Sequence, residues 1–177
     1  MNTISIDYFK TPVGELVIGS FHDKLCLCDW RYRKMRSDID FRIAAGLQAT
    51  YHQAETPVIA QTKAQLTDYF AGTIKTFDLP LLMVGTDFQR SVWDALLQVP
   101  YGTTDTYLGL SKRLNNPKAI RAVASANGAN AIAIIVPCHR IIGSTGELVG
   151  YAGGLPAKRK LLDLESVGTT HQLSLFE

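Results

Sequence analysis

A cysteine, a histidine and an arginine follow one another at the end of a strongly apolar run. The run covers residues 132–136, and Pro137 separates it from Cys138, His139 and Arg140. A thiolate is a strong nucleophile, and an imidazole can remove the proton of a thiol near neutral pH. The pattern indicates either a reactive cysteine close to its base or a small apolar cysteine in the core, which is the commoner role of a free cysteine.

The backbone around Pro137 limits how the histidine could reach the thiol. Proline fixes its own φ and biases Val136 towards an extended conformation, in which neighbouring side chains point to opposite sides. We therefore expect His139 to act on Cys138 through a bridging water or across a turn, and not by the direct contact of a protease dyad.

A carboxylate further along the chain could orient the histidine. Glu165 stands four residues after Leu161 on an expected helix that begins near Pro156, so it shares the face of a leucine that should be buried. A buried carboxylate is costly unless it is paired, and His139 is an available partner. The alternative is that Glu165 marks a frayed, solvated helix end.

A helix is expected directly after Thr86, at the start of the domain that holds the cysteine. Thr86 and Gln89 fit a capping box, in which each side chain satisfies a backbone amide of the other residue. The apolar positions that follow at helical spacing, and that should build the core, are Phe88, Val92, Leu96 and Val99.

Two short helices are expected next, at residues 106–114 and 117–127, joined by Asn115 and Asn116. Asn116 is a favourable N-cap and Pro117 a favourable first helical residue. This arrangement is typical of a helix-turn-helix.

The second of these helices has one apolar face and one nearly bare face. Ile120, Val123 and Ala124 should pack inward. Only Arg121 on the other face is long, whereas a helix that reads the major groove usually carries several long polar side chains. Small residues would let the helix approach a narrow minor groove, or pack it against another segment. The remaining outward residues are Lys118, Ala119, Ala122, Ser125 and Ala126.

The N-terminal part predicts a small sheet. Short strands are expected at residues 3–9, 15–21 and 24–31, and a helix at residues 57–71. The passage from residue 31 to residue 42 is polar and charged. We therefore predict an α+β protein with a small sheet domain over residues 1–85, a mostly helical domain over residues 86–165 and a flexible-looking tail over residues 166–177.

His22, Cys26 and Cys28 invite a metal interpretation, because alternate residues of a strand share a face. No second compact pair of ligands follows, so core packing is the default and no metal site is predicted.

The composition is that of an ordinary globular protein. The chain has 177 residues, of which 46% are hydrophobic and 19% charged, with a net charge of +2. No apolar stretch could span a bilayer, the N-terminus lacks the pattern of a signal peptide, and three cysteines fit a reducing compartment. We expect a monomer in the cytoplasm.

Several of these motifs together resemble one protein family. Pro137 to Ile141, Asn130 eight residues before Cys138, and Gly150 to Gly154 resemble the signature of the bacterial-type O6-alkylguanine-DNA alkyltransferases, also called methylated-DNA–protein-cysteine methyltransferases. The resemblance extends from Thr86 to Glu165. It implies a DNA-repair protein that acts on double-stranded DNA and needs no cofactor. An O6-alkylguanine would be flipped out of the duplex, and its alkyl group would be transferred to the cysteine, once per protein molecule.

The resemblance also implies a role for individual residues. Glu165 would orient His139, which acts through water on Cys138. Tyr107 would donate to guanine N3, and Asn130 would form the turn that leads to the cysteine segment. The residues implied for the alkylguanine pocket are Val136, Tyr151, Ala152 and Gly153.

The implied DNA contacts lie on the two short helices. Arg121 matches the arginine that enters the base stack, and the accompanying positions are Thr106, Lys118, Ala119, Ala122 and Ser125. The resemblance implies a ribonuclease-H-like fold for residues 1–85. Activity on O4-alkylthymine stays open.

Three positions depart from the family pattern. Ala131 stands where proline commonly follows the asparagine, and Asn115 and Ala124 stand where glycine is common. These departures put the rigidity of the loop and the closeness of the helix to DNA in doubt, but the implied catalytic set is intact.

The tail ends in a short apolar motif. Gln172, Leu173, Leu175 and Phe176 resemble the segment by which bacterial proteins bind the replicative sliding clamp. A tethered segment can place its apolar residues in a pocket of a partner. The alternative is that they pack back onto their own domain.

Two other classes of function remain open. One is a non-catalytic helix-turn-helix reader of alkylated DNA, although such readers lack the reactive cysteine. The other is a cysteine hydrolase, which should turn over. The mass of the protein after incubation with O6-methylguanine DNA separates the three classes.

Overall fold

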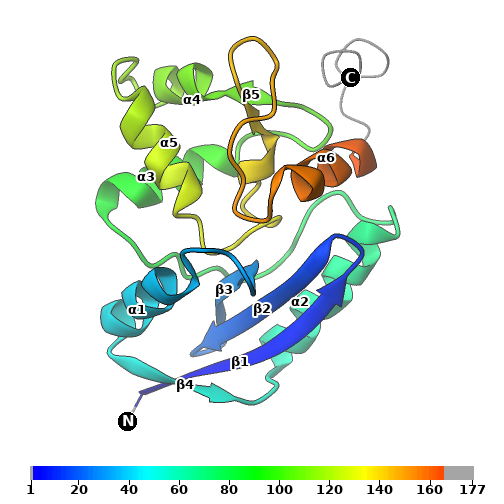
Figure 1. The fold of residues 1–177 in the computed structure, drawn as a ribbon. Helices are drawn as coiled ribbons and strands as arrows, with labels where there is room; N and C mark the ends of the chain where they lie inside the picture. Colours follow the sequence, from blue (N-terminus) through cyan, green and yellow to red (C-terminus); the bar gives the residue numbers. More distant parts are fainter. Residues whose placement is uncertain (1, 166–177) are drawn as a thin grey trace. The chain divides into compact units, whose positions relative to one another are not determined.

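The computed structural model describes residues 2–165 (Figure 1). The described residues divide into two compact units, with the boundary between Gly85 and Thr86. Within the described residues, no helix has the length and apolar character needed to cross a membrane.

The N-terminal unit is built on a four-stranded sheet. Its strands are β1 (Asn2–Thr11), β2 (Gly14–Phe21), β3 (Lys24–Trp30) and β4 (Ala49–Gln53), in the order β3-β2-β1-β4. The first three form antiparallel hairpins, and β4 pairs with β1 in parallel. His22 and Asp23 adopt φ values of 44° and 58° in the turn before β3, which suits a tight hairpin. The three expected strands are confirmed.

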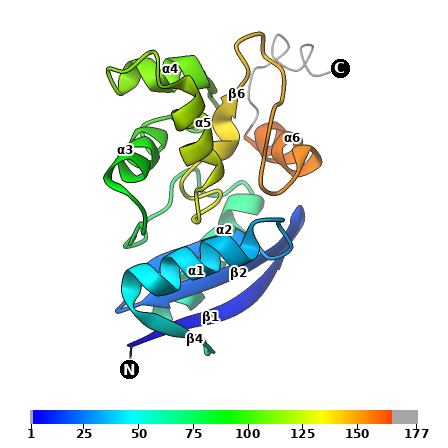
Figure 2. The ribbon, with the colours of Figure 1, turned by 60° about the vertical axis from the view of Figure 1, so that its left-hand side comes forward.

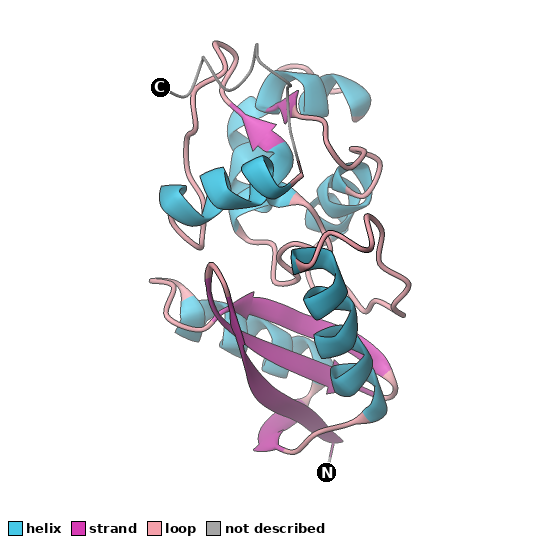
Figure 3. Ribbon diagram, turned by 90° about the vertical axis from the view of Figure 1, so that its right-hand side faces the viewer, coloured by secondary structure: helices cyan, strands magenta, loops and turns pink. Residues whose placement is uncertain are grey.

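Two helices lie on opposite faces of this sheet (Figures 2 and 3). The expected helix is α2 (Pro57–Phe70), capped by the Thr56 hydroxyl, and its buried residues pack across the first three strands. The other helix is α1 (Arg36–Leu47), which buries only Ile39 and Ile43. Residues 31–42 are polar and charged, and no helix was predicted there, but two buried apolar side chains suffice to dock α1.

The two cysteines of β3 belong to the core. Cys26 and Cys28 are buried, and the Cys26 thiol donates to the Gly19 carbonyl at 3.6 Å. Burial raises the pKa of Cys26 to about 12 and that of Cys28 further. Among residues 2–165, no group of three or more His, Cys, Asp or Glu side chains could hold a metal ion.

The C-terminal unit is mainly helical. Its elements are α3 (Asp87–Leu96), β5 (Asp105–Thr106), α4 (Tyr107–Arg113), α5 (Ile120–Gly128), the 3-10 turn η1 (Cys138–Arg140), β6 (Ile141–Ile142) and α6 (Leu155–Leu164). The two short strands pair in parallel. The indole of Trp93 in α3 donates to the Ala126 carbonyl of α5 at 2.8 Å, which ties these two helices together.

The opening of α3 follows the sequence motif. The Thr86 hydroxyl accepts from the Gln89 amide, and the Gln89 side chain accepts from the Thr86 amide, which confirms the capping box. Val92 and Leu96 are fully buried. Phe88 is 37% exposed, so its expected place in the core was wrong. It stands in the first turn of the helix.

The second short helix starts later than its sequence predicts. It begins at Ile120, because Asn116 to Ala119 form a turn closed by a 3.0 Å bond from the Ala119 amide to the Asn116 carbonyl. Ile120 is 39% exposed and Ala126 is buried, so both were assigned to the wrong face. Asn115 takes a φ of 56°, a left-handed conformation that glycine adopts freely and asparagine tolerates better than most residues.

Candidate active site

The segment that leads to the cysteine is a buried series of turns and not a strand. The Val136 amide donates to the Ile132 carbonyl at 2.9 Å, and Ile134 takes a φ of 71°. Asn130 holds this shape, since its side chain donates to the Val136 carbonyl and accepts from the Ile132 amide, each at 2.9 Å. The asparagine expected to form a turn therefore lies where it fixes the backbone just before Pro137.

One 3-10 turn brings the three chemical side chains together. Pro137 precedes η1, and its carbonyl accepts from the Arg140 amide at 3.1 Å. Cys138, His139 and Arg140 are 5%, 0% and 7% exposed. The turn at Pro137 that the sequence offered as one route between histidine and thiol is present.

The histidine is paired with the carboxylate at the end of α6. Nε2 of His139 lies 2.8 Å from Oε1 of Glu165, and Glu165 is 2% exposed. An ionised carboxylate only accepts, so Nε2 carries the proton and Nδ1 of a neutral imidazole keeps its lone pair. That buried Nδ1 has no hydrogen-bonding partner among the described protein atoms. It is therefore available as a base.

Arg140 holds the same carboxylate. Its guanidinium donates to Oε2 of Glu165 at 2.9 Å and to Oε1 at 3.0 Å, and a third nitrogen donates to the Val99 carbonyl at 2.7 Å. Its guanidinium also lies 5.7 Å from the centre of the Tyr101 ring. A two-pronged contact of this kind is among the stronger charge-assisted interactions in proteins.

These contacts set the charge states of the pair. Burial raises the pKa of Glu165, but the hydrogen bonds and charges of His139 and Arg140 outweigh it and lower the pKa to about 2. Burial lowers the pKa of His139, and Glu165 opposes this only in part. At neutral pH the site therefore holds a carboxylate, a guanidinium and a neutral imidazole.

A loop after β6 contributes two tyrosine contacts. The Tyr107 hydroxyl, at the start of α4, donates to the Val149 carbonyl at 3.3 Å. The Tyr151 ring meets the His139 ring edge-on, with centroids 6.5 Å apart. Gly150 and Gly154 take φ values of 55° and 88°, a conformation that other residues rarely adopt. Ala152 and Gly153 lie half-buried between them, and Val136 is fully buried.

The residues assigned to DNA contact are mostly at the surface. Lys118, Arg121, Ala122 and Ser125 are exposed, and Ala119 is half-buried. The Thr106 hydroxyl caps α4 by accepting from the Gly109 amide at 2.9 Å. The expected clamp-binding residues, Gln172, Leu173, Leu175 and Phe176, lie outside the described residues.

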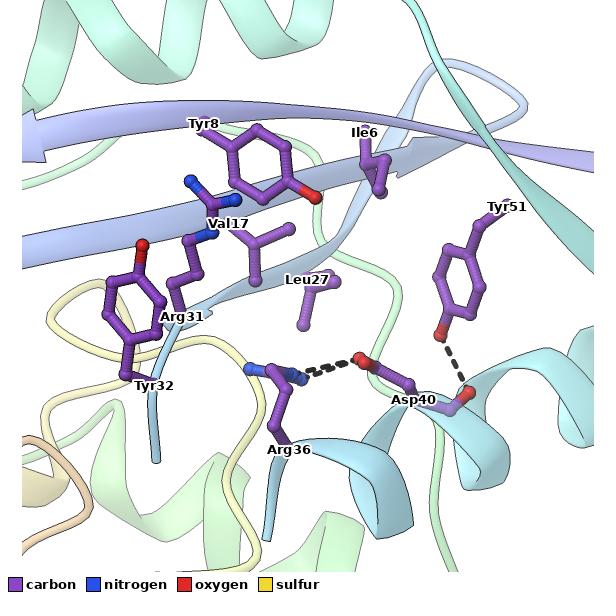
Figure 4. A pocket seen from close by; sticks show the side chains of 9 residues that line it. All are labelled: Ile6, Tyr8, Val17, Leu27, Arg31, Tyr32, Arg36, Asp40 and Tyr51. Atoms are coloured by element: carbon purple, nitrogen blue, oxygen red, sulfur yellow. Dashed lines mark hydrogen bonds and ion pairs between the residues drawn. The ribbon is translucent and has the colours of Figure 1, made fainter. Parts of the chain in front are cut away.

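A separate pocket of about 280 Å³ lies in the N-terminal unit, between the sheet and α1 (Figure 4). Its two arginines are already paired, Arg31 with Glu15 and Arg36 with Asp29 and Asp40. Because their charges are compensated, the pocket offers no free cation for an anionic ligand.

Two residues of the site escaped the sequence assignment. Arg140 was noted only as a fixed positive charge, and Lys158 was not singled out. Lys158 is 0% exposed, and its ammonium donates to three backbone carbonyls of the C-terminal unit. Its position on the same face of α6 as Leu161 and Leu162 was the one available signal.

Fold and site together define an α+β protein whose helical unit holds a buried cysteine next to a histidine–carboxylate pair. Residues 87–167 match the family model of the 6-O-methylguanine DNA methyltransferase DNA-binding domain. A methylated-DNA–protein-cysteine methyltransferase of Methanosarcina acetivorans is 56% identical over 157 residues, or 89% of this chain and 95% of the relative. The constitutive enzyme of that name from Bacillus subtilis is 42% identical over 159 residues, or 89% and 93%.

A solved structure agrees with these sequences. The crystal structure of Mycobacterium tuberculosis OGT in complex with DNA is 36% identical, with a TM-score of 0.77 over 99% of each chain. The present chain therefore belongs to the methylated-DNA–protein-cysteine methyltransferase family.

Replacing Glu165 with Gln should destabilise the protein in a pH-dependent way. Loss of the negative charge at position 165 leaves the buried Arg140 without its counter-ion. This should lower the free energy of unfolding by about 3 kcal/mol at neutral pH. The folded pKa of Glu165, about 2, lies below its ordinary value of 4.5. The stabilisation is thus complete above pH 4.5 and is lost as the pH falls towards 2.

Urea unfolding of the parent and of Glu165→Gln between pH 2 and pH 7 measures this difference. Asp163→Asn is the matched control, because Asp163 is an exposed carboxylate on the same helix. A stability difference that does not change with pH would contradict the assignment of Glu165 as the buried anion.

Proposed function

We propose that this protein repairs DNA by moving the alkyl group of O6-alkylguanine to Cys138, once per molecule and without a cofactor. The observation that carries the proposal is the His139–Glu165 pair in the turn that holds the cysteine. Membership of the family and the DNA complex of the M. tuberculosis relative support the substrate.

The proton path starts at the thiol. Neighbouring side chains of η1 diverge, so His139 takes the proton of Cys138 through a bridging water at Nδ1. The pair of electrons stays on sulfur. Glu165 fixes the tautomer that makes this nitrogen basic, and the neutral state of the imidazole leaves it free to accept.

The transfer itself is a displacement at the alkyl carbon. A sulfur–carbon bond forms as the carbon–O6 bond breaks, and the electron pair passes to the guanine. The proton that guanine then takes up balances the one removed from Cys138. Burial, and then the charge of Cys138, raise the pKa of Tyr107, so its hydroxyl remains a donor for guanine N3 as negative charge develops.

The base must leave the duplex to reach the thiol, which costs a few kcal/mol of stacking and pairing. We assign α4 and α5 as a helix-turn-helix that enters the minor groove. The outward face of α5 carries exposed Ala122 and Ser125, which permit close approach, and exposed Arg121 fills the space of the flipped base. Lys118 and the backbone near Ala119 and Thr106 contact the phosphates.

The loop after β6 closes the alkylguanine pocket in this proposal. Tyr151 packs edge-on against His139, and small Ala152 and Gly153 leave room for the alkyl group. Val136 lies directly before Pro137 and supplies an apolar wall. The larger alkyl groups and O4-alkylthymine are substrates to be compared in the same transfer assay.

The remaining assignments concern the whole chain. The sheet order β3-β2-β1-β4, with β4 parallel to β1, supports a ribonuclease-H-like fold for the N-terminal unit. None of the three cysteines forms a disulfide, which fits a reducing compartment, and we assign the protein to the cytoplasm as a monomer. Residues 172–176 are proposed to bind the replicative sliding clamp.

Incubation with a duplex that contains O6-methylguanine should add one methyl group to the protein. Peptide mass analysis should place it on Cys138, with Cys26 and Cys28 unmodified because burial raises the pKa of both thiols. Cys138→Ser should gain nothing. Binding without a mass change would favour a non-catalytic reader, and repeated release of product a hydrolase.

Tyr107→Phe should slow methyl transfer by about a hundredfold while leaving DNA affinity nearly unchanged, because it removes a donor that acts on the leaving guanine. Single-turnover kinetics gives the transfer rate and fluorescence anisotropy gives the affinity. Equal losses in both would contradict a role in the chemical step.

Deleting residues 172–177 should abolish binding to the sliding clamp and leave methyl transfer to short duplexes unchanged, because none of the residues proposed for catalysis or DNA contact belongs to this motif. Surface plasmon resonance against the clamp measures the first effect. Unaltered clamp affinity would refute the assignment.

A further inference from the structure

A buried ammonium lies within the active-site unit. Lys158 of α6 is 0% exposed, and its Nζ donates to the carbonyls of Ile141, Val149 and Gly150 at 2.5, 3.0 and 3.2 Å. The first carbonyl belongs to β6 and the other two to the loop that Tyr107 also contacts. These three bonds fix both the ammonium and the loop.

The ammonium has no carboxylate partner among residues 2–165. The one buried carboxylate of the site, Glu165, is held by Arg140 through two bonds, so those two charges cancel. Burial of a charge without a counter-ion is costly, and burial lowers the pKa of Lys158 to about 8. Neutral carbonyls reduce this cost but leave the positive charge in place.

The ammonium lies beside the turn that holds the nucleophile, because it binds the carbonyl of Ile141, the residue that directly follows η1, and shares the Val149 carbonyl with the Tyr107 hydroxyl. The negative charge of Cys138 opposes the effect of burial on Lys158, and the interaction is reciprocal: a cation that the thiolate stabilises also stabilises the thiolate. Tyr107 and His139 are neutral near pH 7, and Arg140 compensates Glu165.

We propose that the ammonium of Lys158 is the counter-charge that holds Cys138 as a thiolate, with its position fixed by the three carbonyls. Lys158 is a positioning residue, and its importance for alkyl transfer rests on the function proposed above. Its charge also disfavours protonated His139, so the proton that leaves sulfur passes through the imidazole to solvent and does not stay there.

The test is the pH dependence of Cys138 reactivity in the full-length protein. Lys158→Met keeps the apolar stem and removes the charge. We expect the midpoint of iodoacetamide alkylation at Cys138 to rise by about one pH unit. Lys158→Arg keeps the positive charge, so its alkylation midpoint should lie close to that of the parent. Lys160→Met, at an exposed position of the same helix, should match the parent. A folded Lys158→Met with the parent midpoint would overturn the proposal.

A second measurement keeps Lys158 in place. Cys138→Ser removes the thiolate, so the pKa of Lys158, followed by NMR of its side-chain nitrogen, should fall relative to the parent. An unchanged Lys158 pKa would also overturn the proposal. A purely structural role for Lys158 predicts no such shift.

Failure of this proposal and failure of the proposed function are distinguishable. Iodoacetamide reports on the thiol without DNA, whereas methyl transfer requires the alkylated duplex. If the parent transfers no methyl group, the proposed function fails and the two pKa comparisons still decide the role of Lys158. If methyl transfer occurs, but the alkylation midpoint of Cys138 in Lys158→Met and the pKa of Lys158 in Cys138→Ser both match the parent, only the role of Lys158 is refuted.

Discussion

The carboxylate of Glu165 is the interaction on which the active-site unit depends. It ends α6, accepts a hydrogen bond from His139 and two from Arg140, and so ties that helix to η1. Arg140 extends the connection to the Val99 carbonyl just after α3. Three segments that are far apart in the sequence are thereby fixed around one buried charge. Removing that charge would leave the guanidinium without compensation in the core.

The same arrangement decides the chemistry of the imidazole. A carboxylate alone would favour a protonated histidine, which could not serve as a base. Arg140 neutralises the carboxylate, and full burial of His139 lowers its pKa, so the ring stays neutral while Glu165 still selects the proton position. Arg140 therefore has a function of its own in the cysteine motif, which is to keep His139 neutral by compensating the charge of Glu165.

Local signals allowed much of this structure to be predicted. The capping box at Thr86, the three strands that open the chain and the helix that ends at Glu165 depend on neighbouring residues, and each was found from the sequence. Helix α1 was missed because two buried apolar residues make too weak a periodic pattern. The start of α5 was misplaced because Asn116 and Pro117, good residues for a helix start, also suit the turn that precedes it.

Charge states could not be predicted in the same way, because long-range contacts set them. In the sequence, only the helical spacing from Leu161 and Leu162 separates Lys158 from exposed Arg159 and Lys160, and only the carbonyls of the folded loop make its burial tolerable. The sequence can identify a cysteine, a base and an acid as members of a motif. Whether the thiol is ionised depends on the sum of charges that the fold buries around it. Among the described residues of this unit, the buried charges of Arg140, Lys158 and Glu165 add up to a positive value before the thiol is counted, and this excess favours an anionic sulfur.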